Sequence, residues 1–230
     1  FLQRAYDQIL HDVCLQNLHV ILAIDRSGLV GQDGATHQGI FDMAYLSHIP
    51  NMTIIAPKNR YELTKAMEYA VQFDGPIAVK YSRGDAYYGL KEKLAPIVKG
   101  KSEILFEGEK IALIAVGNMV EEAVAVYERL KAKGHTITLV NARFLKPLDE
   151  ELLLELAKTH SVIITLEEEI YQGGFGQTVS AFYMQQQIKD VTVKNLAIYD
   201  TFVEHGEVSD LRKYLHLDAD SIERVIMRHI

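Results

Sequence analysis

The feature that most constrains the fold is a regular alternation of short apolar runs with segments of helical periodicity along all 230 residues. The apolar runs have the length of buried strands and are bounded by polar or glycine-containing turns. They lie at residues 19–24, 52–56, 76–81, 111–116, 136–140, 161–166 and 196–199. Because strands that alternate with helices form parallel sheets with helices on both faces, we predict an α/β fold of two three-layer units with mainly parallel sheets.

The segments between the apolar runs carry the signals of amphipathic helices. Helices are expected at the N-terminus, over residues 40–47 and 150–158, and twice within 207–229. Three further helices are expected to end near residue 72, at Gly134 and near residue 187. The N-terminal helix would place Leu2, Ala5, Ile9, Val13 and Leu15 roughly on one apolar face. Gly134 provides a C-terminal stop for its helix, and Asp149 an N-terminal cap for the next.

Residues 82–100 interrupt this alternation. The stretch lacks clear periodicity and contains three glycines and a proline, residue types that mark loops. We therefore predict two units, an incomplete one over 1–82 and a complete one over 101–230, joined by a linker over 83–100.

The composition excludes several classes of protein. A formal net charge of −7 argues against a broad nucleic-acid-binding surface. The single cysteine, Cys14, excludes an internal disulfide framework and a cysteine-rich zinc site, and it fits a reducing, cytoplasmic setting. No apolar run approaches the ~20 residues of a membrane span, and no signal peptide is visible. We expect neither nucleic acid nor a membrane as a partner.

The loop over residues 25–39 is the strongest candidate for chemistry, with four glycines, one arginine, two aspartates and one histidine. It follows a predicted strand, and ligands of open α/β sheets bind beyond the carboxyl ends of strands. Arg26 could bind a phosphate, and His37 could exchange a proton or donate to an oxyanion. Asp33 could orient His37 or bind a substrate hydroxyl. On composition alone, a well-capped surface loop is an equally good interpretation.

Three further candidates each have a structural alternative. Arg83 follows the predicted strand at 76–81 and could complete a phosphate clamp with Arg26, although an arginine in such a place more often forms a surface ion pair. Arg4 lies on the N-terminal helix, where a solvated face is the alternative. Phe1 could stack on a heteroaromatic ring or belong to the core.

Other polar segments are weaker candidates. The glycine-rich turn at 173–176 lacks the spacing and the lysine of nucleotide-binding loops, so helix–strand packing is the better interpretation. The three carboxylates at 167–169 have no accompanying ligand cluster and are expected to be solvated or interfacial rather than metal-binding. His205–Gly206 is expected to form a turn, with a subunit contact as the alternative. No residue is therefore assigned to a metal.

Several motifs carry a resemblance to a known family. They are FLQRAYDQ at 1–8, DRSGLVGQDGATHQG at 25–39, YSRG at 81–84, VNARFLKPLD at 140–149 and EEEIYQGGFGQ at 167–177. On these motifs the whole chain resembles the C-terminal portion of the 1-deoxy-D-xylulose-5-phosphate synthases, a family of transketolase-like, thiamine-diphosphate-dependent enzymes. The resemblance implies part of a pyrimidine-binding domain over 1–82 and a C-terminal transketolase domain over 101–230.

The resemblance also implies an activity. The family condenses pyruvate with D-glyceraldehyde 3-phosphate to 1-deoxy-D-xylulose 5-phosphate and CO2, which serves isoprenoid, thiamine and pyridoxal synthesis. Thiamine diphosphate supplies an electron sink for pyruvate decarboxylation and is bound with Mg²⁺. Phe1 matches the aromatic residue that stacks on the cofactor's aminopyrimidine. Family members are homodimers, so we expect a homodimer.

The remaining site residues follow from the same resemblance. Arg26 and Arg83 match the pair that binds the acceptor's phosphate, and Arg4 matches an arginine that lines the same pocket. Asp33 and His37 match the catalytic pair that contacts the pyruvate-derived adduct and the acceptor hydroxyls.

One family motif is absent from the sequence. The GDG-x(n)-N motif, which binds Mg²⁺ and the diphosphate, does not occur, and Gly84-Asp85-Ala86 lacks its third glycine. The family's activating glutamate would precede residue 1. We therefore expect a missing N-terminal region or a separate subunit, and no catalysis by these 230 residues alone. The alternatives are the C-terminal subunit of a split transketolase, a non-catalytic binding module, and the β subunit of a 2-oxo-acid dehydrogenase, which the DG-x-TH loop disfavours.

Overall fold

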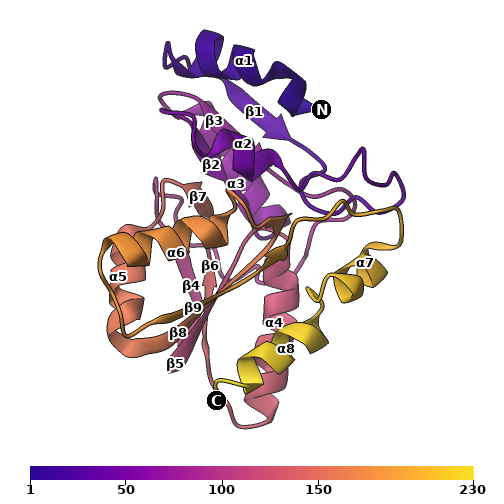
Figure 1. The fold of residues 1–230 in the computed structure, drawn as a ribbon. Helices are drawn as coiled ribbons and strands as arrows, with labels where there is room; N and C mark the ends of the chain where they lie inside the picture. Colours follow the sequence, from indigo (N-terminus) through magenta and orange to yellow (C-terminus); the bar gives the residue numbers. More distant parts are fainter.

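Two sheets form the framework of the computed structural model, which describes all of residues 1–230 (Figure 1). The first sheet has four strands in the order β1-β3-β2-β7. Their bounds are Ile21–Ile24 for β1, Ile77–Lys80 for β3, Thr53–Ile55 for β2 and Phe144–Lys146 for β7. The first three strands are parallel, and β7 pairs antiparallel with β2.

The second sheet has five strands in the order β4-β6-β5-β8-β9. Their bounds are Glu103–Phe106 for β4, Thr138–Asn141 for β6, Lys110–Ala115 for β5, His160–Ile170 for β8 and Thr192–Ile198 for β9. Only β4 is antiparallel to its neighbour. The predicted α/β fold with two mainly parallel sheets is therefore confirmed.

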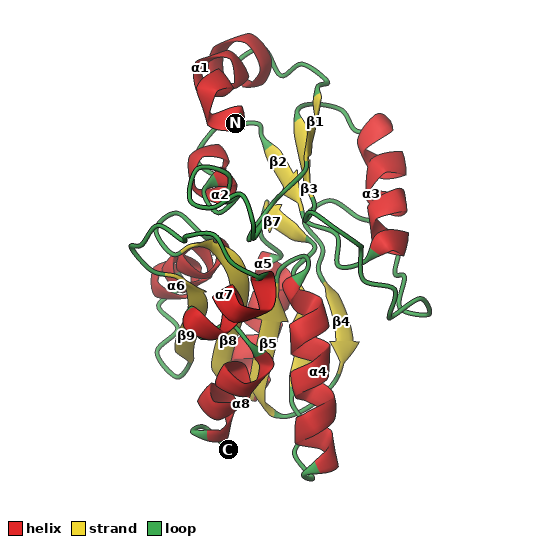
Figure 2. Ribbon diagram, turned by 90° about the vertical axis from the view of Figure 1, so that its right-hand side faces the viewer, coloured by secondary structure: helices red, strands yellow, loops and turns green.

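The helices cover both faces of each sheet, as Figure 2 shows. They are α2 (Asp42–Leu46), α3 (Arg60–Val71), α4 (Met119–Ala132), α5 (Glu150–Thr159), α6 (Phe175–Gln185), α7 (Val208–Tyr214) and α8 (Ala219–Met227). Asp149 caps α5 as predicted, because its side chain accepts a hydrogen bond from the Leu152 backbone N–H at 3.2 Å. None of the helices combines the length and the apolar character that crossing a bilayer requires.

The N-terminal segment is helical but irregular. A 3-10 turn over Leu2–Ala5 leads into α1 (Tyr6–Gln8) and then into a π-helical turn over Ile9–Cys14. Ile9 is buried, but Leu15 is 72% exposed, so the prediction that Leu15 belongs to the apolar face is wrong. The helical segment ends at Cys14, one residue before Leu15, so Leu15 does not extend its apolar face.

The alternating side chains of the strands divide the core between the two faces of each sheet. Leu113 on β5 packs with α4 and α8, whereas its neighbour Ile114 packs with α5 and α6. The second of these clusters continues into the first unit, where it contains Met43 of α2 and Ile54 of β2. This apolar cluster therefore spans both units.

The predicted linker contains no helix or strand, in line with its lack of periodicity. Two strands, β4 and β7, were not predicted. Because β7 lies within the predicted second unit but pairs with β2 of the first sheet, three residues of that unit complete the sheet of the other. The domain boundaries at residues 82 and 100 stay a prediction.

Candidate functional site

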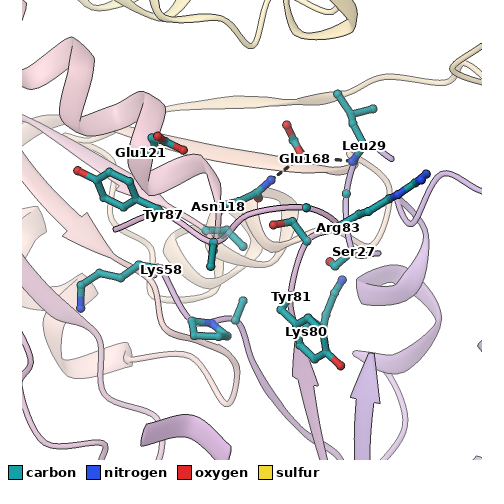
Figure 3. Close-up of a pocket in the computed structure, with 18 of the residues that line it drawn as sticks. Ser27, Leu29, Lys58, Lys80, Tyr81, Arg83, Tyr87, Asn118, Glu121 and Glu168 are labelled. Carbon is teal, nitrogen blue, oxygen red and sulfur yellow. Dashed lines mark hydrogen bonds between the residues drawn. The ribbon is translucent and has the colours of Figure 1, made fainter. Parts of the chain in front are cut away.

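The carboxyl ends of strands from both sheets meet around one cavity of about 470 Å³ (Figure 3). Lys58 and Lys80 follow β2 and end β3 of the first sheet, and Asn118 follows β5 of the second. Glu168 and Arg212 line the same space from β8 and α7. Open α/β sheets bind ligands beyond the carboxyl ends of their strands, so this position is a natural ligand site.

A second cavity of about 290 Å³ lies along β1. Its walls combine the aromatic rings of Phe1 and Phe41 with the apolar side chains of β1, and Arg26 and His37 add polar groups. The cavity thus combines aromatic and aliphatic walls with polar groups, a mixture typical of small-molecule sites.

The glycine-rich loop over residues 25–39 lies at the ends of β1 and β3 and borders both cavities. Two backbone hydrogen bonds of 2.8 Å between Gly28 and Gly39 close its base. A Cβ atom on Gly39 would lie 1.9 Å from the Arg26 carbonyl oxygen, so only glycine permits this closure. Arg26 itself adopts a φ of 60°, a conformation uncommon outside glycine and concentrated at functional sites.

The loop brings three of the predicted residues together at the second cavity. The Phe1 and His37 rings meet edge to face with centroids 5.1 Å apart. His37 Nδ1 is 2.9 Å from the Thr36 hydroxyl, and Arg26 lines the same cavity. Phe1 is 71% exposed, so the core alternative for this ring does not hold.

Two further predicted residues form an ion pair at the rim of the first cavity. Arg83 donates a hydrogen bond of 2.8 Å to Asp33, which joins the loop after β3 to the glycine-rich loop. Both side chains keep more than a third of their surface exposed. Arg4 is exposed on the first turn, lines neither cavity, and its side chain makes no hydrogen bond or ion pair. The structure therefore does not bring Arg4 to Arg83.

The carboxylates at 167–169 are not solvated, which corrects that part of the prediction. All three are buried at the carboxyl end of β8. Glu167 accepts hydrogen bonds from the backbone N–H groups of Phe175 and Gly176 at 2.8 and 2.7 Å. Burial, with a contribution from Glu169, raises the pKa of Glu167 to about 8. Glu169 pairs with Lys80, and Glu168 with Arg212, so the interfacial alternative describes the last two.

Residues 203–206 also belong to the surroundings of the glycine-rich loop. The Gln38 side chain donates to the Glu204 carbonyl at 3.1 Å, and the Gly206 N–H donates to the Gly31 carbonyl at 3.2 Å. His205–Gly206 thus forms a contact within the chain. This contact could not be predicted, because nothing in the local pattern at 203–206 indicates a partner some 170 residues away.

No group of three or more histidine, cysteine, aspartate or glutamate side chains is placed to hold a metal ion. We assign no residue of this chain to Mg²⁺.

Comparisons with known proteins agree with this architecture. The transketolase pyrimidine-binding domain matches residues 1–87, and the transketolase C-terminal domain matches residues 100–222. The chain is 51% identical over 228 residues to the 1-deoxy-D-xylulose-5-phosphate synthase of Lachnoclostridium phytofermentans, and 48% identical over 228 residues to that of Clostridium tetani. These alignments cover 99% of this chain but only 36% and 37% of the two relatives.

Solved structures share the fold. A structure titled "Split gene transketolase, inactive beta4 tetramer" superposes with a TM-score of 0.83 at 27% identity, covering 98% of this chain and 71% of that one. The transketolase of Campylobacter jejuni superposes with a TM-score of 0.79 at 20% identity, covering 99% of this chain and 34% of that one, and it supports the fold alone. The chain therefore belongs to the transketolase family, and its sequence is similar to the C-terminal portion of the family's 1-deoxy-D-xylulose-5-phosphate synthases.

Proposed function

We propose that this chain forms the acceptor-binding and pyrimidine-binding part of a 1-deoxy-D-xylulose-5-phosphate synthase. The reaction is the thiamine-diphosphate-dependent condensation of pyruvate with D-glyceraldehyde 3-phosphate, with loss of CO2. A cytoplasmic location, Mg²⁺ dependence, a homodimeric assembly and a contribution to isoprenoid, thiamine and pyridoxal synthesis are parts of the same proposal. Its support is about 50% identity to curated synthases along nearly the whole chain.

The observation that carries the proposal is the glycine-rich loop between the two cavities. The loop and its neighbours present the aromatic contact of Phe1 with His37 on one side and the ion pair of Arg83 with Asp33 on the other. An enzyme that joins a ring-bound fragment to a phosphorylated aldehyde needs an apolar ring site next to a cationic one. This loop borders both.

Arg83 and Arg26 are the proposed phosphate-binding residues, although Arg83 lines the first cavity and Arg26 the second. Asp33 uses one donor of the Arg83 guanidinium, whose five N–H groups leave others free for a phosphate. Asp33 competes with the acceptor for that one donor, and an exposed pair of this kind costs little to rearrange. Arg4 would join this pocket only after a displacement of the first helical turn.

Phe1 and His37 are the proposed contacts to the cofactor and the reacting groups. The exposed face of Phe1 is free to stack on an aminopyrimidine, while its contact with His37 orients the imidazole. The thiazolium of bound thiamine diphosphate supplies the electron sink for decarboxylation. His37, with a half-buried side chain and a hydroxyl partner in Thr36, can move a proton to or from the acceptor carbonyl oxygen.

A chimera tests the proposal. The segment of the L. phytofermentans synthase that aligns with this chain is replaced by the chain itself, and CO2 release is measured with pyruvate and D-glyceraldehyde 3-phosphate. We expect turnover in the chimera, and a rise of about 100-fold in the KM for the aldehyde phosphate in its Arg83→Gln variant, since a charged hydrogen-bond donor to a phosphate is lost.

The matched control is Arg60→Gln, because Arg60 is exposed at the start of α3 and lines neither cavity. It should leave the KM unchanged. A folded chimera without turnover would contradict the proposed activity, and an unchanged KM in Arg83→Gln would contradict the assignment of Arg83.

A second candidate function is a subunit of a split transketolase. The 27% identity to the split-gene transketolase structure favours it. It would be preferred if the chimera lacked turnover while this chain restored activity to a second chain that binds the diphosphate and its metal.

A further inference from the structure

The glycine-rich loop packs against the second unit of the protein. Leu29 and Ile40, near the two ends of the loop, are buried in the core cluster of α4 and α8 rather than in the first unit. Backbone hydrogen bonds at the base join Gly28 to Gly39, and Ser27 to Tyr81. One backbone donor of this base, the Leu29 N–H, has a side-chain partner from the other unit.

That partner is Glu168, a buried carboxylate at the end of β8. Its Oε2 atom accepts hydrogen bonds from the Leu29 N–H at 3.2 Å and from the Asn118 amide at 2.8 Å (Figure 3). Its Oε1 atom accepts from Arg212 Nε at 2.5 Å. All three partners are donors, so the site is built for a carboxylate and not for an amide.

The fit between the loop and Glu168 depends on glycine at position 28. Gly28 has a φ of 79°, and a Cβ atom on it would lie 2.5 Å from Glu168 Oε2. The loop backbone therefore passes directly over the carboxylate, at a distance that no other residue type permits. The neighbouring Glu169 adds a 3.3 Å hydrogen bond from the Ser27 hydroxyl and an ion pair with Lys80.

Arg212 fixes the carboxylate from the opposite side. Burial disfavours its charge, but Glu168 and Glu122 outweigh that effect and raise the pKa of Arg212. Arg212 donates to Glu122 at 3.0 Å, so it keeps one anionic partner even when Glu168 is neutralised. A substitution at Glu168 therefore releases the loop without leaving Arg212 wholly unpaired.

We propose that Glu168 is a positioning residue that sets the glycine-rich loop, and with it Arg26, Asp33 and His37, from the second unit. The inference deepens the proposed function and rests on it for the meaning of the positioned residues. If Glu168 had a merely structural role, its loss would destabilise the whole molecule. If it is a positioning residue, its loss should mainly increase the local opening of residues 28–39.

Amide hydrogen exchange on the full chain tests this directly. In Glu168→Gln, we expect the amides of residues 28–39 to exchange about tenfold faster, because an amide group faces three donors there. Exchange in α4 and α8 should not change. The matched control is Glu122→Gln, which removes the other partner of Arg212 and should leave loop exchange as in the wild type.

A second readout concerns binding. Glycerol 3-phosphate serves as the probe for the acceptor site in titration calorimetry. We expect Glu168→Gln to weaken its binding about threefold to tenfold, because the loop that carries Arg26 and Asp33 becomes less ordered. In the chimera, the same substitution should raise the KM for the aldehyde phosphate and leave the KM for pyruvate unchanged.

The outcomes separate the two proposals. Exchange that is unchanged, or that rises equally in the loop and in α8, would overturn the positioning role while leaving the synthase proposal intact. Absence of synthase activity would leave the exchange result standing. If Glu168→Gln does not fold, Glu168→Asp keeps the charge beside Arg212 and shortens the reach to Leu29. Loss of the folded state in both variants would also overturn the inference.

Discussion

Two charged clusters of this protein lie within one molecule but in opposite surroundings. The first, the buried cluster, joins the two units and consists of Lys58, Glu62, Glu103 and Arg143. The second, the exposed pair, consists of Asp33 and Arg83. Side-chain exposure is at most 7% in the buried cluster, and it is 37% and 42% in the exposed pair.

The buried cluster is balanced and fully satisfied. Lys58 Nζ lies 2.7 Å from Glu103, Arg143 Nε lies 2.7 Å from Glu62, and Asn141 donates to both Glu62 oxygens at 3.0 Å. Burial alone would raise the pKa of Glu62, but Arg143 and Lys58 outweigh it and hold that pKa below the ordinary value. Removing one member would leave a charge without compensation in a dry interior.

The exposed pair has the opposite property. Water already solvates both charges, so the pair adds little to stability and opens at little cost. The comparison shows that the same ion-pair chemistry is fixed in the structure where it is dry and free to rearrange where it is wet. Two substitutions test this difference, and a third tests a buried carboxyl that belongs to neither cluster.

The largest effect is expected in the buried cluster. Glu62→Gln leaves Lys58 and Arg143 with one shared carboxylate, and the free energy of unfolding at pH 7 should fall by about 3–5 kcal/mol. Urea denaturation measures it. The control is Glu68→Gln on the same helix, whose surface pair with Lys65 should contribute under about 1 kcal/mol. Similar small losses in both variants would remove the distinction between dry and wet pairs.

The next effect concerns the buried, unpaired carboxyl of Glu167. Because its pKa is raised to about 8 in the folded protein, the folded state binds more protons than the unfolded state above an ordinary glutamate pKa. Stability should therefore fall as the pH rises from about 5 to about 8, by up to about 1.4 kcal/mol per pH unit relative to Glu167→Gln. Urea midpoints across this range measure the difference in slope.

The control for this slope is Glu155→Gln, since Glu155 is an exposed partner of Lys158. Its slope should match that of the wild type. Parallel curves for the wild type and Glu167→Gln would show that Glu167 is ionised throughout the range.

The smallest effect on stability is expected in the exposed pair. Asp33→Asn should change the free energy of unfolding by less than about 1 kcal/mol. In about 1 M salt, which screens exposed charges, this difference from the wild type should disappear. Since Arg83 loses its competing carboxylate, its affinity for inorganic phosphate should rise by about threefold, as titration calorimetry measures. A stability loss as large as that of Glu62→Gln would be the contrary result.

The sequence predicts the regular part of this molecule well and its contacts across units poorly. Alternating apolar runs and helices gave both sheets, because burial of parallel strands leaves a strong local signal. The strand β4 was not predicted because its apolar run is only three residues long, over 104–106, between Glu103 and Glu107. The strand β7 was not predicted because it is only three residues long and follows β6 after two residues. Periodicity also does not show where a chain passes from one sheet to another.

The candidate site shows the same limit. The composition of residues 25–39 indicated a functional loop, and the structure does place Arg26 and His37 at one cavity and Asp33 beside Arg83. The burial of residues 167–169 was not predictable, because three adjacent carboxylates are solvated unless distant donors surround them. The donors to Glu168 come from residues 29, 118 and 212, which only the tertiary structure brings together.

The strand β7 has a consequence for the order in which this protein takes shape during synthesis. The first sheet pairs residues 53–55 with residues 144–146, so its last strand leaves the ribosome some 90 residues after the strand that it borders. Until then, the edge of β2 presents unpaired backbone groups of the kind that invite association with other chains. The first unit thus emerges with an open edge, and the second unit must be made as far as residue 146 before that edge is covered.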